Sequence, residues 1–410
     1  MTRPARRLSG GLAALVVVAG CSGNASPNLT ATAKPETTYT ATPTASPTVT
    51  NPPAGQMSRR RSDHTATLLA GGRVLIVGGY DHGRALDSAN LFDPGSETFI
   101  ATGSLAAARS YHTATLLQDG RVLVVGGTPR DWTFNGPFLT SAELFDPLTG
   151  MFTPTGSLAT ARNLHTATLL LDGRVLIVGG NDSEPHSLAS AELYDPKTST
   201  FNPTGSMATA RGFHAATLLD DGRVLVTGGT SAAWDGPPFL ASAELYDPVS
   251  GTFSPARPMT EARASHTATL LADGRVLLTG GIRTDGGETS VPSAELYDPK
   301  TSKFTLTGHM ADGRTFHEAT LLADGRVLVT GGDPDGWKYG GPFLASAEIY
   351  GPAIGRFATT GPMADAITSH SATRLADGRV LIAGGYDGVD LASAEIYDPD
   401  LGAFRLLGSR

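Results

Sequence analysis

A seven-bladed all-β propeller, with four antiparallel strands in each blade, is the fold class that this sequence predicts. Three observations predict it: a unit of about 50 residues recurs seven times, each unit holds four short strand patterns, and no unit shows helical periodicity. The 410 residues include 50 Gly and 27 Pro, which supply turns without reaching the share that marks low-complexity chains.

The repeat is registered by a pair of glycines and by a histidine that precedes each pair at a constant offset. Successive pairs are 48, 53, 49, 52, 51 and 53 residues apart. A period of this size is typical of propellers and solenoids. The glycine pairs are Gly78-Gly79, Gly126-Gly127, Gly179-Gly180, Gly228-Gly229, Gly280-Gly281, Gly331-Gly332 and Gly384-Gly385, and the histidines are His64, His112, His165, His214, His266, His317 and His370.

The third copy shows how four strands fit into one repeat. Residues 165–171 form a first strand, and the Asp-Gly that follows is a two-residue hairpin signal. Residues 174–180 are a continuous apolar strand of the kind that is buried on both faces. A polar loop leads to a third strand at 191–194, and residues 201–205 form the outermost strand. Four strands without a helix predict one propeller blade per copy.

The N-terminus has the pattern of an export signal. Residues 1–20 carry three arginines followed by a short apolar stretch, too short to cross a hydrocarbon core of about 20 residues' span. Val18-Ala19-Gly20-Cys21 resembles the bacterial lipobox, in which the cysteine is lipidated and becomes the first residue of the mature protein. Cys21 is the predicted lipidation site, and an ordinary signal peptide with an incidental cysteine is the alternative.

Residues 21–56 are predicted to be a tether, and residues 57–410 the propeller. The tether is rich in Thr, Ser, Pro and Ala and has no apolar periodicity, so it cannot bury enough surface to offset its chain entropy. A bare spacer is the simpler interpretation, and O-glycosylation is the alternative.

The repeat resembles the kelch motif. A double glycine ends the second strand, an aromatic residue and usually Asp-Pro end the third, and an aromatic residue occupies the fourth, where Phe stands in place of the family's usual Trp. Gly351-Pro352 departs from the Asp-Pro pattern in the sixth copy. The last copy has all four strands, so we expect blade 7 to close against blade 1 without a borrowed strand, although residues 50–57 could pair along an edge. The third-strand aromatics are Phe92, Phe145, Tyr194, Tyr246, Tyr297, Tyr350 and Tyr397, and those of the fourth strand are Phe99, Phe152, Phe201, Phe253, Phe304, Phe357 and Phe404.

Three sets of polar residues repeat with the blades, and we interpret them as structural. The histidines are expected to satisfy local backbone groups rather than to bind metal. An arginine precedes the histidine by three residues in six copies, with Ile367 in the seventh, and a glutamate opens the third strand in six, with Asn90 in the first. If each arginine pairs with the glutamate one blade onward, the two exceptions become one missing ion pair. The alternative interpretation is that the arginines form a ring that binds an anion.

The loops between second and third strands break the seven-fold symmetry. Blades 2, 4 and 6 carry longer loops, each with a tryptophan and a Pro-Phe-Leu sequence. In proteins that the repeat resembles, these loops lie on the ligand-binding face, and exposed aromatic rings suit sugar stacking or peptide anchoring. The alternative is that each tryptophan folds back to hold its own loop. The predicted ligand-binding residues are Trp132, Phe134, Trp234, Trp337 and Tyr339.

Composition and motifs exclude several functions. The net charge of −8 argues against a nucleic-acid partner. The resemblance extends to copper-radical oxidases similar to galactose oxidase, whose cofactor needs a cysteine crosslinked to tyrosine, and the single cysteine is Cys21. No catalytic residue, metal ligand or cofactor is predicted.

The sequence therefore predicts a monomeric, lipid-anchored propeller outside the cytoplasm that binds a cell-surface glycan or protein without catalysis. The alternatives are a sugar-acting enzyme, such as an isomerase, and a purely structural interaction scaffold.

Overall fold

The computed structural model describes residues 55–129, 137–183, 186–232, 236–284, 288–336 and 342–408. The chain divides into two units, Met1–Thr48 and Val49–Arg410, and the first lies wholly outside the described residues, as does the predicted lipidation site Cys21. Within the described ranges, no helix is long and apolar enough to cross a bilayer.

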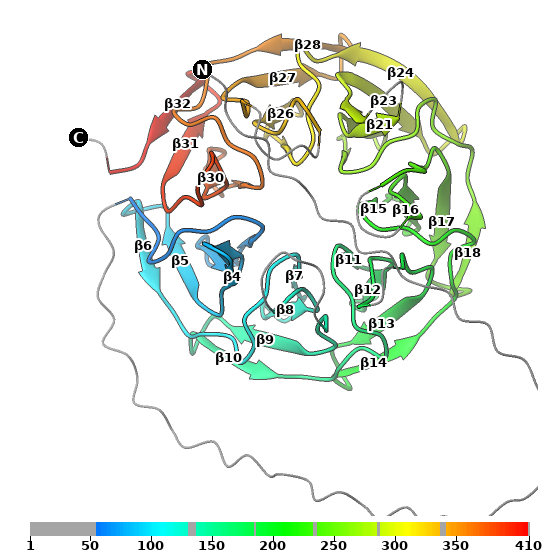
Figure 1. Cartoon of the computed structure of the whole chain (residues 1–410), viewed down its shortest axis with the longest axis horizontal. Helices are drawn as coiled ribbons and strands as arrows, with labels where there is room; N and C mark the ends of the chain where they lie inside the picture. The colour runs from blue at the N-terminus through cyan, green and yellow to red at the C-terminus, as the bar shows by residue number, and fades with distance from the viewer. Residues whose placement is uncertain are drawn as a thin grey trace, which may run out of the picture. The chain divides into compact units, whose positions relative to one another are not determined.

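The described residues form a closed ring of seven four-stranded blades around one axis (Figure 1). This confirms the predicted fold class. Short two-stranded ribbons, β3 (Tyr80–Asp81) with β4 (Arg84–Ala85) and β21 (Ile282–Thr284) with β22 (Glu288–Ser290), extend from blades 1 and 5. In order from the axis outward, the blades are β1 (Thr65–Leu68), β2 (Val74–Val77), β5 (Ala89–Asp93) and β6 (Thr98–Ala101); β7 (Thr113–Leu116), β8 (Val122–Val125), β9 (Ala142–Asp146) and β10 (Met151–Pro154); β11 (Thr166–Leu169), β12 (Val175–Val178), β13 (Ala191–Asp195) and β14 (Thr200–Pro203); β15 (Ala215–Leu218), β16 (Val224–Thr227), β17 (Ala243–Asp247) and β18 (Thr252–Pro255); β19 (Thr267–Leu270), β20 (Val276–Thr279), β23 (Ser293–Asp298) and β24 (Lys303–His309); β25 (Glu318–Leu321), β26 (Val327–Thr330), β27 (Ala347–Gly351) and β28 (Arg356–Thr359); β29 (Ser371–Arg374), β30 (Val380–Ala383), β31 (Ala394–Asp398) and β32 (Ala403–Leu406).

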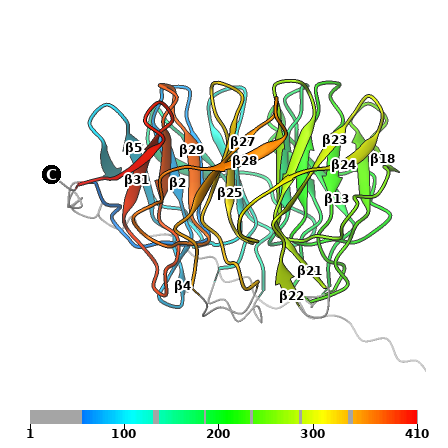
Figure 2. The same cartoon turned by 90° about the horizontal axis from the view of Figure 1, so that it is seen from above.

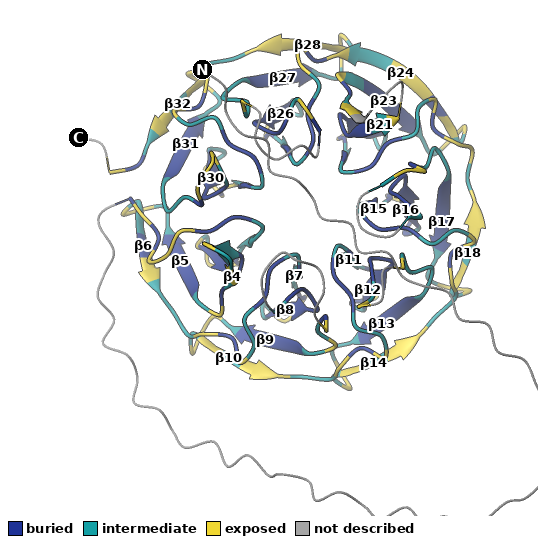
Figure 3. Cartoon of the chain, viewed as in Figure 1, coloured by how far each residue is buried: buried dark blue, intermediate teal, exposed yellow. Residues whose placement is uncertain are grey.

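Burial follows the order of the strands within a blade. The second strands, such as β12, are buried along their whole length, and the third strands are buried except at their ends. The fourth strands, such as β14, are the most exposed strands of the blades (Figure 3). A strand such as Val175–Val178 can be apolar at every position because neighbouring blades cover both of its faces. The core is therefore a series of apolar layers between blades.

The double glycine is required by the close approach of the next blade. In blade 2, Gly126 and Gly127 have φ angles of +64° and +98°. A Cβ on Gly126 would lie 2.6 Å from the carbonyl oxygen of Arg162 in blade 3. The Gly127 N–H donates to that same oxygen at 2.8 Å. The equivalent bond recurs around the ring and joins Gly385 of blade 7 to Arg61 of blade 1 at 2.9 Å, so each glycine pair links two blades.

The aromatic residues that recur on the third and fourth strands of every blade also have a physical role. The rings of the third and fourth strands pack in every blade with centroids 4.7–5.0 Å apart, from Phe92 with Phe99 to Tyr397 with Phe404. The Tyr246 hydroxyl in blade 4 also hydrogen-bonds the Thr204 hydroxyl in blade 3 at 2.8 Å. These aromatics therefore hold the outer strands to their own blade and to the preceding one.

The histidine ring is structural, and its members bond mainly to the preceding blade. Each imidazole Nε2 hydrogen-bonds a hydroxyl of that blade, as His112 does with Thr65 at 3.0 Å. The predicted local backbone contact is present for His214, with Arg211, and for His317, with Arg314. Where the usual threonine is Ala215, the hydroxyl of Thr227 takes its place beside His266. Burial, reinforced by the neighbouring arginine, lowers the pKa of every ring histidine below its usual value, so these imidazoles are neutral.

The prediction that each arginine pairs one blade onward is wrong. Arg109 donates to Glu143 of its own blade at 2.8 Å, and blades 3 to 6 repeat this pair. The arginine enters the blade beside the third strand because it also donates to the Gly126 and Ser141 carbonyls. The two exceptions are therefore separate: Arg61 meets Asn90 in blade 1, whereas Glu395 of blade 7 has Ile367 where its partner would be.

Blades 1 and 7 close the ring without strand exchange, as predicted. All four strands of blade 7 are consecutive in the sequence. Met57 is buried against blade 7, and its N–H donates to the Ala392 carbonyl at 2.9 Å, but it adds no strand among the described residues. On the outer side, Glu97 of blade 1 accepts from Arg379 at 2.8 Å and from Arg405 at 2.7 Å. Apolar packing and this charge cluster therefore form the closure.

Candidate functional site

The propeller has two dissimilar faces (Figure 2). One carries the hairpin turns between first and second strands. The other carries the loops between second and third strands, from which β4 and the β21–β22 ribbon project. The segment that enters each first strand lies on this second face, because residue 62 bridges residue 80 just after the double glycine.

A ring of residues in the left-handed conformation surrounds the axis on that second face. Each immediately precedes a ring histidine and has φ between +50° and +54°. Backbone hydrogen bonds join these residues from blade to blade. The N–H of Asp63 donates to the carbonyl oxygen of Ser369, the N–H of Tyr111 to that of Asp63, and the N–H of Leu164 to that of Tyr111. We call this ring the collar, and it consists of Asp63, Tyr111, Leu164, Phe213, Ser265, Phe316 and Ser369.

The backbone conformation of the collar is the same in all seven blades, but its side chains differ from blade to blade. On one side, Phe213 and Phe316 pack edge to face with centroids 6.3 Å apart. On the other side, Asp63 and Ser369 present polar groups next to Tyr111. Since the blades are otherwise so alike, this difference between the two sides of the collar marks where the propeller can distinguish one ligand from another.

The polar side of the collar opens into a pocket of about 320 Å³ formed by blades 7, 1 and 2. This is within the range of small-molecule sites. Its walls combine tyrosine rings with carboxylates and hydroxyls. The lining residues are Ser62, Asp63, Tyr80, His82, Gly83, Tyr111, Thr368, Ser369, Tyr386, Gly388, Val389 and Asp390.

Asp63 is the most perturbed acid in this pocket. Burial raises its pKa to about 6, although the hydroxyls of Ser369, Ser62 and Tyr111 each oppose that rise by stabilising the carboxylate. Charge repulsion from nearby Asp390 contributes to this rise. The Ser62 hydroxyl lies between the two acids, 3.2 Å from the Asp63 carboxylate and 2.8 Å from that of Asp390. A carboxyl group with this pKa can either accept or donate a proton near neutral pH.

Asp390 joins the first and last blades at the pocket wall. It is 4% exposed, and it accepts from the Ser62 hydroxyl and, at 2.9 Å, from the His82 N–H of blade 1. The exposed His82 imidazole lies 2.5 Å from the Asp81 carboxylate. Asp81, His82 and Asp390 offer one ligand atom each within 4.8 Å of one another, which makes them the group among the described residues that is arranged to hold a cation.

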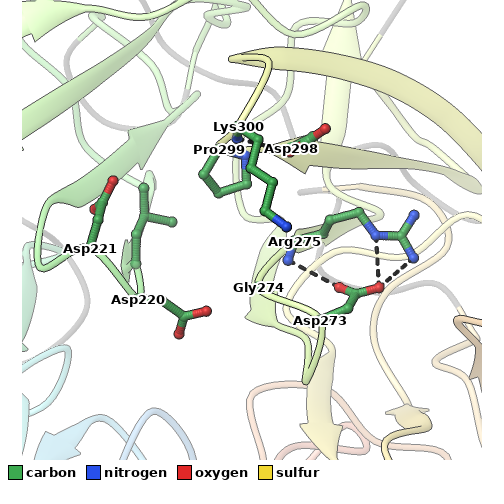
Figure 4. Close-up of a pocket in the computed structure, with 9 residues that line it drawn as sticks. Asp220, Asp221, Asp273, Gly274, Arg275, Asp298, Pro299 and Lys300 are labelled. Atoms are coloured by element: carbon green, nitrogen blue, oxygen red, sulfur yellow. Dashed lines mark hydrogen bonds and ion pairs between the residues drawn. The ribbon is translucent and has the colours of Figure 1, made fainter.

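A second hollow lies on the hairpin face, between blades 4 and 5 (Figure 4). It has a volume of about 520 Å³ and is lined by Asp220, Asp221, Asp273, Arg275 and Lys300, with Arg275 paired to Asp273. The Asp-Gly-Arg turn recurs in six blades, and a similar hollow of about 580 Å³ occurs between blades 7 and 1. It is therefore a product of the repeat, and we do not assign it as the functional site.

The predicted ligand-binding residues Trp132, Phe134, Trp234, Trp337 and Tyr339 all lie outside the described residues. What the structure does describe is the Phe-Leu end of each insertion. Phe138 and Phe239 are buried, and Phe239 packs against Ala264 and Ile282. In blade 6, Phe343 packs edge to face on Tyr386, with centroids 5.6 Å apart. The blade 6 insertion thus reaches the pocket wall.

The sequence interpretation missed the residues of the pocket. Two signals pointed to them: the residue before the histidine is Asp or Tyr in blades 1 and 2 alone, and the residue after the double glycine is Tyr in blades 1 and 7 alone. Neither signal shows that these positions meet, because the meeting depends on how the ring closes.

Comparisons with known proteins agree with this fold. Residues 162–208 and 211–260 match the Kelch motif. Over 123 residues, 29% of this chain, the sequence is 32% identical to spermatocyte protein spe-26 of Caenorhabditis elegans, and the match spans 20% of that protein's length. The fold resembles that of a fungal alcohol oxidase of the AA5 family in complex with copper, at a TM-score of 0.69 and 17% identity over 86% of this chain and 76% of the oxidase.

A further solved structure, that of YjhT, has a TM-score of 0.58 at 12% identity and covers 75% of this chain and 99% of the other. At these sequence identities, the likeness of the two solved structures to this chain is one of fold alone. The chain is therefore a seven-bladed β-propeller in which residues 162–208 and 211–260 match the Kelch motif.

Proposed function

We propose that this propeller is a lipid-anchored binding module outside the cytoplasm, and that it binds a carbohydrate in the pocket between blades 7, 1 and 2 without catalysis. The observation that carries the proposal is the pocket itself. Three tyrosines and two acids line it, on the side where the collar carries Asp63, Tyr111 and Ser369.

The shape and chemistry of the pocket favour a sugar over a flat protein surface. A volume of about 320 Å³ suits one or two sugar rings. Tyrosine rings provide apolar faces for the C–H side of a sugar, and the hydroxyls and carboxylates of Ser369, Asp63 and Asp390 provide partners for its hydroxyl groups. Trp132, Trp234 and Trp337, if exposed as the sequence predicts, would extend this surface for a longer glycan.

The anchor and location are proposed from the N-terminal sequence. A lipidated Cys21 followed by a Thr/Ser/Pro-rich tether would hold the propeller near the membrane while leaving it free to reach a surface glycan.

The proposal is tested by screening the purified propeller on a glycan array and measuring the affinity of the hits by calorimetry. Tyr111→Ala should weaken binding about 10-fold or more, because it removes one wall of the pocket. Leu164→Ala is the matched control, since Leu164 occupies the collar position of the next blade outside the pocket. No bound glycan, or equal losses in both variants, would contradict the proposal.

One observation favours a second candidate, a sugar-acting enzyme. The Asp63 carboxyl, with its pKa raised to about 6, is suited to transfer a proton to or from a sugar ring oxygen or anomeric hydroxyl. Such an enzyme would speed the interconversion of anomers, which proton NMR of a freshly dissolved pure anomer follows directly. Acceleration that Asp63→Asn abolishes would establish this candidate over simple binding.

A further inference from the structure

We propose that the pocket between blades 7, 1 and 2 selects ligands that carry a positively charged amine, so that its sugar is an amino sugar with a free ammonium group. This inference rests on the proposed function and names the chemical class of the ligand.

The first argument is the charge of the pocket. Asp63 and Asp390 both line it, and Asp81 stands beside its His82 rim. No lysine or arginine occurs among the described residues that line it. An ammonium group placed here gains attraction from two acids, whereas a carboxylate is repelled by both.

The second argument concerns the basic residues around the pocket, which do not line it. Arg61 lies beneath the collar, but it is fully buried and donates to Gly78, Ser88 and Asn90. Arg84 lies on β4 and is exposed to solvent at the rim. Asp63 and Asp390 therefore have no lysine or arginine partner among the residues that line the pocket.

The third argument is the aromatic lining. Tyr80, Tyr111 and Tyr386 come from blades 1, 2 and 7 and converge on one pocket of about 320 Å³. A cation is attracted to the face of an aromatic ring, by about 0.5–2 kcal/mol depending on how far it is desolvated. Several aromatic rings combined with acids form the chemical pattern that recognises ammonium ions, and the same rings can stack on a sugar.

The fourth argument is the rigidity of the acids. Asp390 is 4% exposed and held by Ser62 and the His82 N–H, and Asp63 is held by hydroxyls from blades 1, 2 and 7. Charges that are fixed before binding lose little entropy when the ligand arrives. The geometry therefore favours an ammonium group at a defined position over diffuse attraction of any cation.

The test compares ligands that differ in charge at one position. Calorimetry at pH 7.5, with EDTA present, measures the affinity of the full propeller for glucosamine, N-acetylglucosamine, glucuronic acid and tetramethylammonium. We expect glucosamine to bind at least 10-fold more tightly than N-acetylglucosamine and glucuronic acid to show no binding. Asp63→Asn and Asp390→Asn should each reduce the preference for glucosamine about 10-fold, and Leu164→Ala should leave it unchanged. Melting temperatures of all variants verify folding.

The outcomes separate this inference from the proposed function. Equal affinity for glucosamine and N-acetylglucosamine overturns the inference and leaves carbohydrate binding intact. Binding of tetramethylammonium without any sugar overturns carbohydrate binding and supports recognition of the ammonium group. Glucosamine binding that appears only when Zn²⁺ replaces EDTA, and is lost in His82→Ala, overturns the inference by showing that Asp81, His82 and Asp390 hold a metal.

Discussion

The guanidinium of Arg61 donates to the side-chain oxygen of Asn90 at 3.2 Å, where blades 2 to 6 each place an arginine against a glutamate. Arg61 is therefore a buried cation without a carboxylate at the position that serves the other blades. Burial, together with a smaller contribution from the nearby Arg59, lowers its pKa to about 10, although Asp81 opposes this change. Blade 1 is the blade in which the amide of Asn90 takes the place of the carboxylate in the repeated ion pair.

Restoring the carboxylate should stabilise the propeller. Asn90→Glu should raise the free energy of unfolding by about 1–3 kcal/mol, because a hydrogen bond to a buried charge replaces one to an amide. Thermal and urea unfolding of the two proteins measure this difference. The converse change, Glu143→Gln, leaves the buried Arg109 with an amide in place of its carboxylate, as in blade 1, and should cost about 1–3 kcal/mol. A destabilised Asn90→Glu protein would contradict the pairing argument.

The histidine ring should make the propeller sensitive to acid. In the folded protein the pKa of each ring histidine is lowered, to about 3 for His214 and His370, whereas in the unfolded chain it is near 6.5. The unfolded state therefore binds more protons as the pH falls below 6.5, and stability is progressively lost between pH 6.5 and about 3. Melting temperatures between pH 8 and 4 should fall steeply below 6.5, and a flat profile would contradict neutral buried imidazoles.

Asp63 should act in the opposite direction. Its folded pKa is about 6, above the usual value of 3.8, so the folded state holds a proton that the unfolded state has lost. Its contribution to stability is therefore present below pH 4 and is lost as the pH rises to about 6. Asp63→Asn, which stays neutral, should be more stable than the parent protein at pH 7.5 and no more stable at pH 4. Melting temperatures at the two pH values check this sign.

The tryptophan loops should contribute to binding more than to stability. Phe138 and Phe239 are buried at the ends of two of these loops, where they can anchor them. Trp132→Ala, Trp234→Ala and Trp337→Ala should each weaken glycan binding by about 1–3 kcal/mol with little change in melting temperature. Phe138→Ala is the matched control and should lower the melting temperature. Uniform destabilisation with unaltered affinity would show that the tryptophans hold their loops.

The predicted anchor is tested at Cys21. If acyl chains on this cysteine are the anchor, Cys21→Ala should leave an intact propeller that moves from the detergent phase to the aqueous phase on phase partitioning. The same distribution for both proteins would contradict lipidation at this residue.

The sequence by itself determined the number of blades, the four strands in each and the positions of their turns. These features are local: an Asp-Gly between two apolar runs forms a hairpin wherever it occurs, and seven copies in register show which positions are equivalent. The sequence also showed where each double glycine lies. The structure explains its presence, because a backbone with positive φ that contacts the next blade leaves no room for a side chain.

The tertiary structure alone decided which residues meet. Each arginine pairs with the glutamate of its own blade rather than the next, because its guanidinium also needs the carbonyls of that blade's double-glycine loop. Ser62 and Asp390, 328 positions apart, come together because the ring closes between blades 1 and 7. Equivalent positions reveal what all blades share, but a binding pocket forms where they differ, and only the closed ring places those differing side chains side by side.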